Sequence, residues 1–210
     1  MEIILHRRNK INQLLDVDNK YGVEIDLRTF NEEIILHHDP FAKGELFSDW
    51  IKHYNHGTLI LNVKEEGLEE RIKNILDNEK IKNYFFLDQS FPSLVASANS
   101  GEKNCAVRFS EYESIETVLS LSNKVSWVWA DCFTKYVLNE KNSTILHDNG
   151  FKICLVSPEL QGRNLKDEID LILQKIANEN IIIDAVCTKK PQIWDQGVNK
   201  WLKAFAWTRT

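Results

Sequence analysis

Short runs of apolar, β-branched and aromatic residues recur along this 210-residue chain, and each run has the length of a β-strand. Polar and charged residues separate one run from the next. The runs are residues 3–5, 23–27, 34–36, 59–63, 84–87, 106–109, 125–130, 153–156 and 181–186. The pattern predicts a chain built largely from short strands.

The segments between these runs carry apolar residues three or four positions apart, which is the spacing of one helix face. The groups are Ile11, Leu14 and Leu15; Leu68, Ile72, Ile75 and Leu76; Ile169, Ile172 and Ile176; and Ile193, Trp194, Val198 and Trp201. Strand and helix therefore alternate from end to end. Such alternation is typical of parallel strands joined by helical crossovers.

The run at 34–36 follows the run at 23–27 too closely for a crossover helix, so we expect it to form a hairpin-like extension. Setting it aside leaves eight strands. We therefore predict an α/β fold: a single (β/α)8 TIM barrel with short helices and loops over residues 1–210. A doubly wound open sheet is the alternative. The chain has neither a G-x-G-x-x-G nor a G-x-x-x-x-G-K-[ST] motif, which disfavours dinucleotide and P-loop sites.

Composition is that of an ordinary globular protein, with 43% hydrophobic and 27% charged residues. The formal net charge is −5 and Lys and Arg form no basic stripe, which argues against a nucleic-acid partner. No run approaches a membrane span, and the three apolar residues near the N-terminus do not form a signal peptide. We expect a cytoplasmic protein whose four separated cysteines are buried, reduced thiols.

Two carboxylates occur in the second run. Glu24 and Asp26 are two positions apart, so they point to the same side of the predicted strand. Burying such a pair without partners is costly, and a hard divalent cation with oxygen ligands would offset that cost. The other interpretation is a pair of salt bridges at a strand end, with Arg28 as one partner.

Histidine and lysine side chains stand at the ends of neighbouring runs. His6 follows the first run, and Asn62 and Lys64 end the run at 59–63. His37 and His38 follow the run at 34–36 and would face opposite ways in an extended chain, so we expect at most one of them to share a site. Imidazoles exchange protons near neutral pH, and a lysine in an apolar strand needs a carboxylate or a phosphate. The combination suits phosphodiester cleavage.

These residues, in this order, resemble the glycerophosphodiester phosphodiesterase family, whose superfamily includes the phosphatidylinositol phospholipase C barrels. The motifs that carry the resemblance lie in roughly the first 65 residues and are His6-Arg7, Glu24-x-Asp26, His38-Asp39 and x-x-Lys64. The resemblance implies that His6 and His38 are the acid–base or nucleophile pair. It implies that Arg7 and Lys64 hold the phosphate, and that Glu24 and Asp26 bind Mg2+ or Ca2+.

The chain also departs from the family pattern. Arg8 replaces a usual glycine, and Asn62 replaces the usual third acidic metal ligand. An amide oxygen still coordinates a hard cation, although it adds no charge. Asp88, which ends the run at 84–87, is our candidate for an additional ligand, with Asp131 behind it. The short gap between residues 38 and 64 leaves out the insertion that shapes the substrate pocket in many relatives.

The resulting functional hypothesis is a metal-dependent phosphoric diester hydrolase that acts on a small phosphodiester with a glycerol or sugar headgroup. Two alternatives stay open. One is a barrel that binds a phosphorylated ligand without turnover, and the other is intramolecular transfer that yields a cyclic phosphate. The sequence does not choose an oligomeric state.

Overall fold

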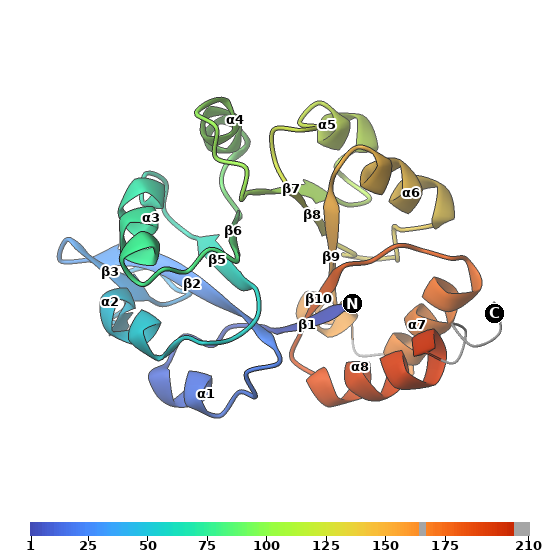
Figure 1. Cartoon of the computed structure of the whole chain (residues 1–210), viewed down its shortest axis with the longest axis horizontal. Helices are drawn as coiled ribbons and strands as arrows, with labels where there is room; N and C mark the ends of the chain where they lie inside the picture. Colours follow the sequence, from blue (N-terminus) through green and yellow to red (C-terminus); the bar gives the residue numbers. More distant parts are fainter. Residues whose placement is uncertain (164–166, 204–210) are drawn as a thin grey trace. The chain divides into compact units, whose positions relative to one another are not determined.

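The computed structural model describes residues 1–163 and 167–203, and its Cα positions divide into two compact units. The N-terminal unit is Ile4–Ala106. The C-terminal unit is Met1–Ile3 together with the described part of Val107–Thr210. Strands and helices alternate along the colour gradient of Figure 1. All of the site residues implied by the family resemblance belong to the N-terminal unit.

The strand β2 (Gly22–Phe30) organises the sheet of the N-terminal unit. It pairs in parallel with β1 (Glu2–Leu5) and with β5 (Leu59–Val63), and β5 pairs in parallel with β6 (Tyr84–Leu87). Every residue of β5 and the first six residues of β2 are buried. Parallel strands covered on both faces read as continuous apolar runs, which is why both were visible in the sequence.

A hairpin extends the far end of β2, as the spacing predicted. After a turn in which Asn31 and Glu32 have φ of 49° and 67°, β3 (Glu33–Leu36) pairs antiparallel with β2. A two-residue strand that the sequence did not predict, β4 (Glu45–Leu46), then pairs antiparallel with β3. Gly44 lets this return strand approach closely, since a Cβ at that position would lie 2.3 Å from the Leu36 carbonyl oxygen.

The helices of the N-terminal unit bury the expected faces only in part. Of the face predicted for α3, Leu68, which precedes the helix, and Ile72 and Leu76 are buried, whereas Ile75 is half-buried. In α1, Leu14 is buried but Leu15 is 64% exposed, so the predicted shared face is wrong there. A five-residue helix makes little more than one turn and presents one residue to the core. The helices are α1 (Ile11–Leu15), α2 (Phe47–Trp50), the 3-10 helix η1 (Ile51–His53), α3 (Glu69–Asn78) and α4 (Phe91–Asn99).

The C-terminal unit continues the alternation. Its strands lie in the order β10, β9, β8, β7, and β9 pairs in parallel with both β8 and β10. In α7, Ile169, Ile172 and Ile176 are buried, as their spacing predicted. The elements are β7 (Ala106–Phe109), α5 (Ile115–Leu119), β8 (Trp127–Ala130), α6 (Glu140–Asp148), β9 (Lys152–Val156), η2 (Pro158–Gln161), α7 (Glu168–Asn178), β10 (Ala185–Thr188), α8 (Pro191–Gly197) and η3 (Val198–Lys203).

The last strand begins later than its apolar run predicted. Within the run at 181–186, β10 starts only at Ala185. The residue before it, Asp184, bonds to the neighbouring strands partly through its side chain. Its carboxylate accepts from Ile153 N at 2.8 Å, and its carbonyl accepts from Glu2 N at 2.7 Å. Of the apolar residues at 181–183, Ile181 is buried and the other two are half-buried as the chain approaches the strand.

Other expectations about burial are met. Cys105, Cys132, Cys154 and Cys187 are all buried free thiols, as predicted. Trp50 and Trp194 are fully buried. Over residues 1–163 and 167–203, none of the helices combines the length and the apolar character that a membrane crossing requires.

Candidate active site

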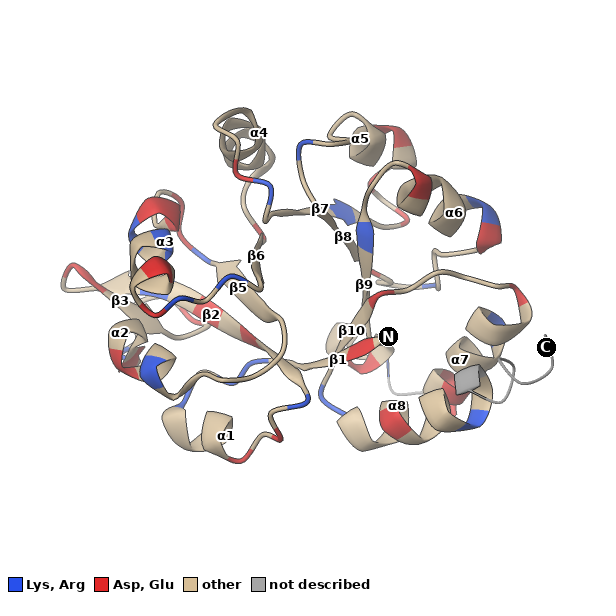
Figure 2. Ribbon diagram, in the orientation of Figure 1, with Lys and Arg blue, Asp and Glu red and all other residues tan. Residues whose placement is uncertain are grey.

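The predicted site residues of the N-terminal unit meet where its parallel strands end. Leu5 of β1 pairs with Val23, which places His6 beside Glu24. Asp26 is the register partner of Asn62, and Asn62 is the partner of Leu87, so Lys64 and Asp88 follow adjacent strand ends. Acidic residues colour the body of β2 in Figure 2, although the strand is buried. The pairing register therefore builds one site from four neighbouring strands, β1, β2, β5 and β6, and their loops.

Glu24 is fully buried and held by two hydrogen bonds. Its Oε1 accepts from Asn62 Nδ2 at 2.9 Å, and its Oε2 accepts from the Arg7 backbone N–H at 2.7 Å. His6 Nε2 lies 3.8 Å from the same Oε2. Burial, and after it the negative charge of Asp26, raises the pKa of Glu24 from 4.5 to about 7. The ionised form of Glu24 is therefore costly in this site, mainly because the carboxyl is buried.

Asp26 is also fully buried, and two cations face it. Arg7 Nε lies 3.1 Å from Oδ2, and Lys64 Nζ lies 3.6 Å from Oδ1. Lys64 Nζ also lies 3.1 Å from Asp88 Oδ2. The requirement of Lys64 for a carboxylate partner is thereby met. Asp88 is linked to Asp26 by Lys64, whose ammonium lies near both carboxylates. The role of Asp88 as a metal ligand stays a prediction.

Arg28 has a different role from the salt bridge that was one interpretation of the carboxylate pair. Its Nε donates to the His38 carbonyl at 2.9 Å, and its Nη1 donates to the Lys64 carbonyl at 3.3 Å. Within the described residues it pairs with neither Glu24 nor Asp26, so Arg28 was the wrong partner, although Asp26 does form salt bridges, with Arg7 and Lys64. Arg28 instead ties together the two segments that carry His38 and Lys64.

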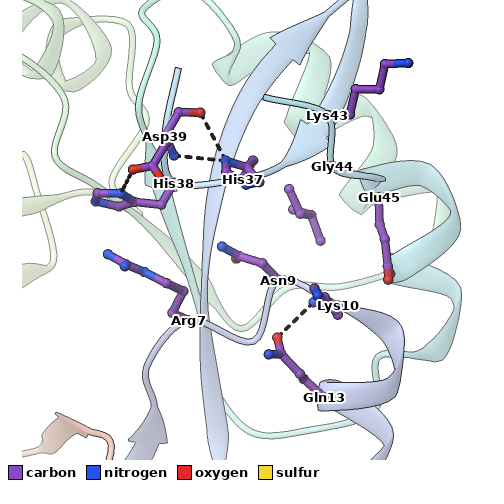
Figure 3. Close-up of a pocket in the computed structure, with 11 residues that line it drawn as sticks. Arg7, Asn9, Lys10, Gln13, His37, His38, Asp39, Lys43, Gly44 and Glu45 are labelled. Carbon is purple, nitrogen blue, oxygen red and sulfur yellow. Dashed lines mark hydrogen bonds and ion pairs between the residues drawn. The ribbon is translucent and has the colours of Figure 1, made fainter. Parts of the chain in front are cut away.

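His38 lies on the loop that leaves β3. The backbone N–H of His37 donates to the Asp26 carbonyl at 3.1 Å, which brings this loop to the site. The His38 side chain is 43% exposed, and its Nδ1 lies 2.8 Å from Asp39 Oδ1. His37 and His38 both line the cavity shown in Figure 3, and which of them takes part in the chemistry stays a prediction. The strand ends at Leu36, and the alternation of side chains ends with it.

The backbone is strained at two of the site residues. Arg7 has φ of 57° and Asp88 has φ of 62°, in the left-handed region that residues with a Cβ rarely adopt. Such conformations persist where the surrounding structure enforces them, and they cluster at functional sites. At Arg7 the enforcing contact is the hydrogen bond from its N–H to Glu24. The strain is therefore consistent with a built site at these strand ends.

The oxygen atoms of this site suit a hard divalent cation. Among the described residues, Asp26 Oδ1 and Asn62 Oδ1 are buried side-chain oxygens without a hydrogen-bond partner. Both are ligand types that Mg2+ and Ca2+ prefer. No cluster of three His, Cys, Asp or Glu residues suited to a metal occurs in the part of the chain that the structure describes. The amide of Asn62 stands where a third carboxylate would complete one.

Asp131, the reserve candidate for a further acid, is engaged elsewhere. It belongs to the C-terminal unit, where its Oδ2 lies 2.5 Å from Arg108 Nη1 and its Oδ1 accepts from Gln161 Nε2 at 2.6 Å. These contacts account for a carboxylate that is almost completely buried. Asp131 therefore has a structural explanation that needs no metal.

A cavity of about 530 Å³ opens beside Arg7 and His38. In Figure 3 these two side chains lie at one end of the cavity, and Lys43 and Glu45 lie at the other. Its wall mixes polar groups with the carbon atoms of long side chains, and its lining residues are Arg7, Asn9, Lys10, Gln13, Leu36, His37, His38, Asp39, Lys43, Gly44 and Glu45. The cavity has the volume of a small-molecule site, and charged and amide groups are available in its wall.

Sequence reasoning missed Asn9 and gave Arg28 a different role from the one it has in this site. Asn9 binds Asp26 by two hydrogen bonds, and Arg28 binds the two backbone carbonyls described above. The signal for Arg28 was its position, two residues after Asp26 on the same side of the strand. For Asn9 the sequence offered less: the one indication was that it lies three residues after His6.

The pKa of Glu24 predicts how the stability of the metal-free protein depends on pH. The native state keeps a proton on Glu24 that the unfolded chain releases above pH 4.5, so the free energy of unfolding should fall as pH rises from 4.5 to about 7. The fall from this group is about 3 kcal/mol. Urea unfolding in EDTA at pH 5 and pH 8 measures it. Glu24→Gln should flatten this dependence, and an unchanged slope in that variant would refute the assignment.

Comparison with known proteins supports the fold. No model of a protein family and no curated protein sequence matches the chain. A glycerophosphoryl diester phosphodiesterase structure from Parabacteroides distasonis is 13% identical, with a TM-score of 0.65, and the match covers 95% of this chain and 86% of that one. A glycerophosphodiester phosphodiesterase structure from Agrobacterium tumefaciens is 10% identical, with a TM-score of 0.63, and the match covers 94% of this chain and 99% of that one. The chain therefore has the α/β, TIM-barrel-like fold of these proteins, which confirms the predicted fold class.

Proposed function

We propose that this protein is a metal-dependent phosphoric diester hydrolase that acts on a small glycerophosphodiester-like or sugar-phosphodiester substrate. The observation that carries the proposal is the arrangement around Asp26. One buried carboxylate has two cations beside it, a buried amide oxygen in register with it, and His6 near the neighbouring Glu24. The shared fold with glycerophosphodiester phosphodiesterases supports the same conclusion.

The proposed roles follow from exposure and position. His38 is the more exposed of the two imidazoles and lines the cavity, so it donates a proton to the oxygen of the departing alcohol. His6 takes the proton from the attacking water as the new P–O bond forms. Arg7 and Lys64 hold the phosphate oxygens. A divalent ion held by Glu24, Asp26 and Asn62 supplies positive charge to the phosphoryl group when it is bound.

The cavity supports a polar alcohol as the departing group. Its lining offers amide, imidazole, ammonium and carboxylate groups that can bind the hydroxyl groups of such an alcohol. If a hydroxyl of the substrate attacks in place of water, the same proton transfers yield a cyclic phosphate. Phosphorus NMR separates the two products.

The test is release of p-nitrophenol from bis-p-nitrophenyl phosphate by the purified protein with Mg2+, with Ca2+ and with EDTA. We expect release that depends on the ion. The runner-up function is a barrel that binds a phosphorylated ligand without turnover, and the observation behind it is that Arg7 and Lys64 already balance Asp26. Calorimetry that finds glycerol phosphate bound equally well in EDTA, with no p-nitrophenol released, would establish the runner-up.

Arg28 gives a further prediction, because it positions His38 and Lys64 by their carbonyls. Arg28→Gln removes the bridge, and we expect kcat to fall by about tenfold or more, since small displacements of catalytic groups cost large factors in rate. Arg71→Gln is the matched control, because Arg71 also donates to a backbone carbonyl, that of Glu32, at an exposed position. Steady-state kinetics in which both variants behave alike would count against the positioning role.

A further inference from the structure

Asn9 lies on the loop between β1 and α1, and both polar atoms of its side chain bind Asp26. Asn9 Nδ2 donates to Asp26 Oδ2 at 2.8 Å, and Asp26 N donates to Asn9 Oδ1 at 2.9 Å. One amide therefore holds the backbone and the carboxylate of the same residue. Asp26 is completely buried, so no bulk water competes for these bonds.

These bonds fix the rotation of the Asp26 carboxylate. The terminal torsion of an aspartate is broad, so an unrestrained carboxylate would sample many orientations. Here Oδ2 is taken by Asn9 and by Arg7 Nε. Oδ1 is left without a hydrogen bond among the described residues, next to the strand that carries the equally unpartnered Asn62 Oδ1. The Asn9 contact thus determines which oxygen is available to a ligand.

The loop that carries Asn9 is held by other contacts as well. Arg7 N donates to Glu24 Oε2 at 2.7 Å, Arg8 N donates to the Glu24 carbonyl at 2.8 Å, and Trp50 Nε1 donates to the Arg8 carbonyl at 2.9 Å. Figure 3 shows the Asn9 side chain between Arg7 and Lys10 at the wall of the cavity. Because the loop has these anchors, removing the Asn9 side chain should free the carboxylate without releasing the loop.

We propose that Asn9 is a positioning residue that turns Asp26 Oδ1 toward a divalent cation. The proposal rests on the proposed function, in which Glu24, Asp26 and Asn62 hold that cation. Hydrogen bonds to a liganding carboxylate from outside the ligand set orient it, and their loss typically costs 10- to 100-fold in metal affinity. Asn9 has the contacts of such a group: it donates to one oxygen of the carboxylate, and the other has, among the described residues, no hydrogen bond and only the Lys64 ammonium near it, at 3.6 Å.

The experiment is calorimetric titration of Mg2+ and Ca2+ into the wild type, Asn9→Ala and Asn83→Ala. Asn83 is the matched control, since its side chain also forms a partly buried hydrogen bond in this unit, to Thr58 at 3.1 Å. We expect the Kd of Asn9→Ala to rise by about 10- to 100-fold and that of Asn83→Ala to stay within about twofold. Thermal unfolding in EDTA measures what each side chain contributes to stability alone.

Wild-type affinity in Asn9→Ala would overturn the proposal, and so would equal weakening in both variants. If Asn9→Ala does not fold, Asn9→Ser carries the test, because its hydroxyl can still accept from the buried Asp26 N–H. A wild type that binds neither ion overturns the metal part of the proposed function, and this proposal with it. A wild type that binds while Asn9→Ala binds equally well overturns this proposal alone.

Discussion

Replacing His6 with alanine is expected to lower kcat/KM for a glycerophosphodiester by about 10²- to 10⁴-fold, the usual contribution of a positioned general acid or base. His6 is mostly buried, and its Nε2 lies 3.8 Å from Glu24, so no mobile surface group can replace it. The remaining cations would still bind the phosphate, so we expect the effect mainly in kcat. Initial rates over a range of substrate concentrations separate kcat from KM.

His53→Ala is the control for this substitution. His53 belongs to the same unit and is exposed on η1, so its removal should leave kcat within about twofold. If His6→Ala remained folded and retained wild-type activity, the assignment of His6 as the proton acceptor would be wrong. Circular dichroism of both variants establishes that they are folded.

Replacing Asp26 with asparagine should abolish the response of the protein to divalent ions. Asp26 faces Arg7 at 3.1 Å and Lys64 at 3.6 Å, and it supplies one of the two unpartnered oxygens of the site. We expect Mg2+ or Ca2+ to raise the Tm of the wild type and to leave that of Asp26→Asn unchanged, because an ion stabilises only the state that binds it. Activity should fall by about 100-fold or more.

The same substitution should also destabilise the metal-free protein by about 1–3 kcal/mol, because both cations lose their shared buried partner while each is part-exposed. Asp49→Asn is the control, since Asp49 forms an exposed ion pair with Lys52 at 3.0 Å and should change stability little. An ion-induced shift in Tm that survives in Asp26→Asn would place the cation elsewhere.

The sequence predicted the fold class because buried parallel strands leave a simple pattern. The runs that correspond to β2 and β5 are buried on both faces, so their apolar residues alone were enough to predict strands. Predictions failed where local pattern and tertiary contact diverge. The apolar residues 181–183 approach a strand without joining it, and the two-residue β4 exists because Gly44 permits a close backbone approach.

The candidate site could be predicted only for residues whose type and position both carry information. Glu24 and Asp26 stand out as charges in an apolar strand, and the structure places them with Arg7, Asn62 and Lys64. Asn9 could not be predicted for two reasons. Its hydrogen bonds to Asp26 depend on where the loop lies beside β2, and asparagine is common in loops, so its presence there is not distinctive. The pairing register, which no single strand specifies alone, decides such contacts.

The central claim is tested most directly by phosphorus NMR of a glycerophosphodiester incubated with the purified protein. With Mg2+ or Ca2+ present, we predict that the diester resonance is replaced by that of a phosphomonoester, or of a cyclic phosphate if transfer is intramolecular. After chelation the diester should persist. A diester that stays intact under every condition would contradict the assignment of this site as a phosphodiesterase.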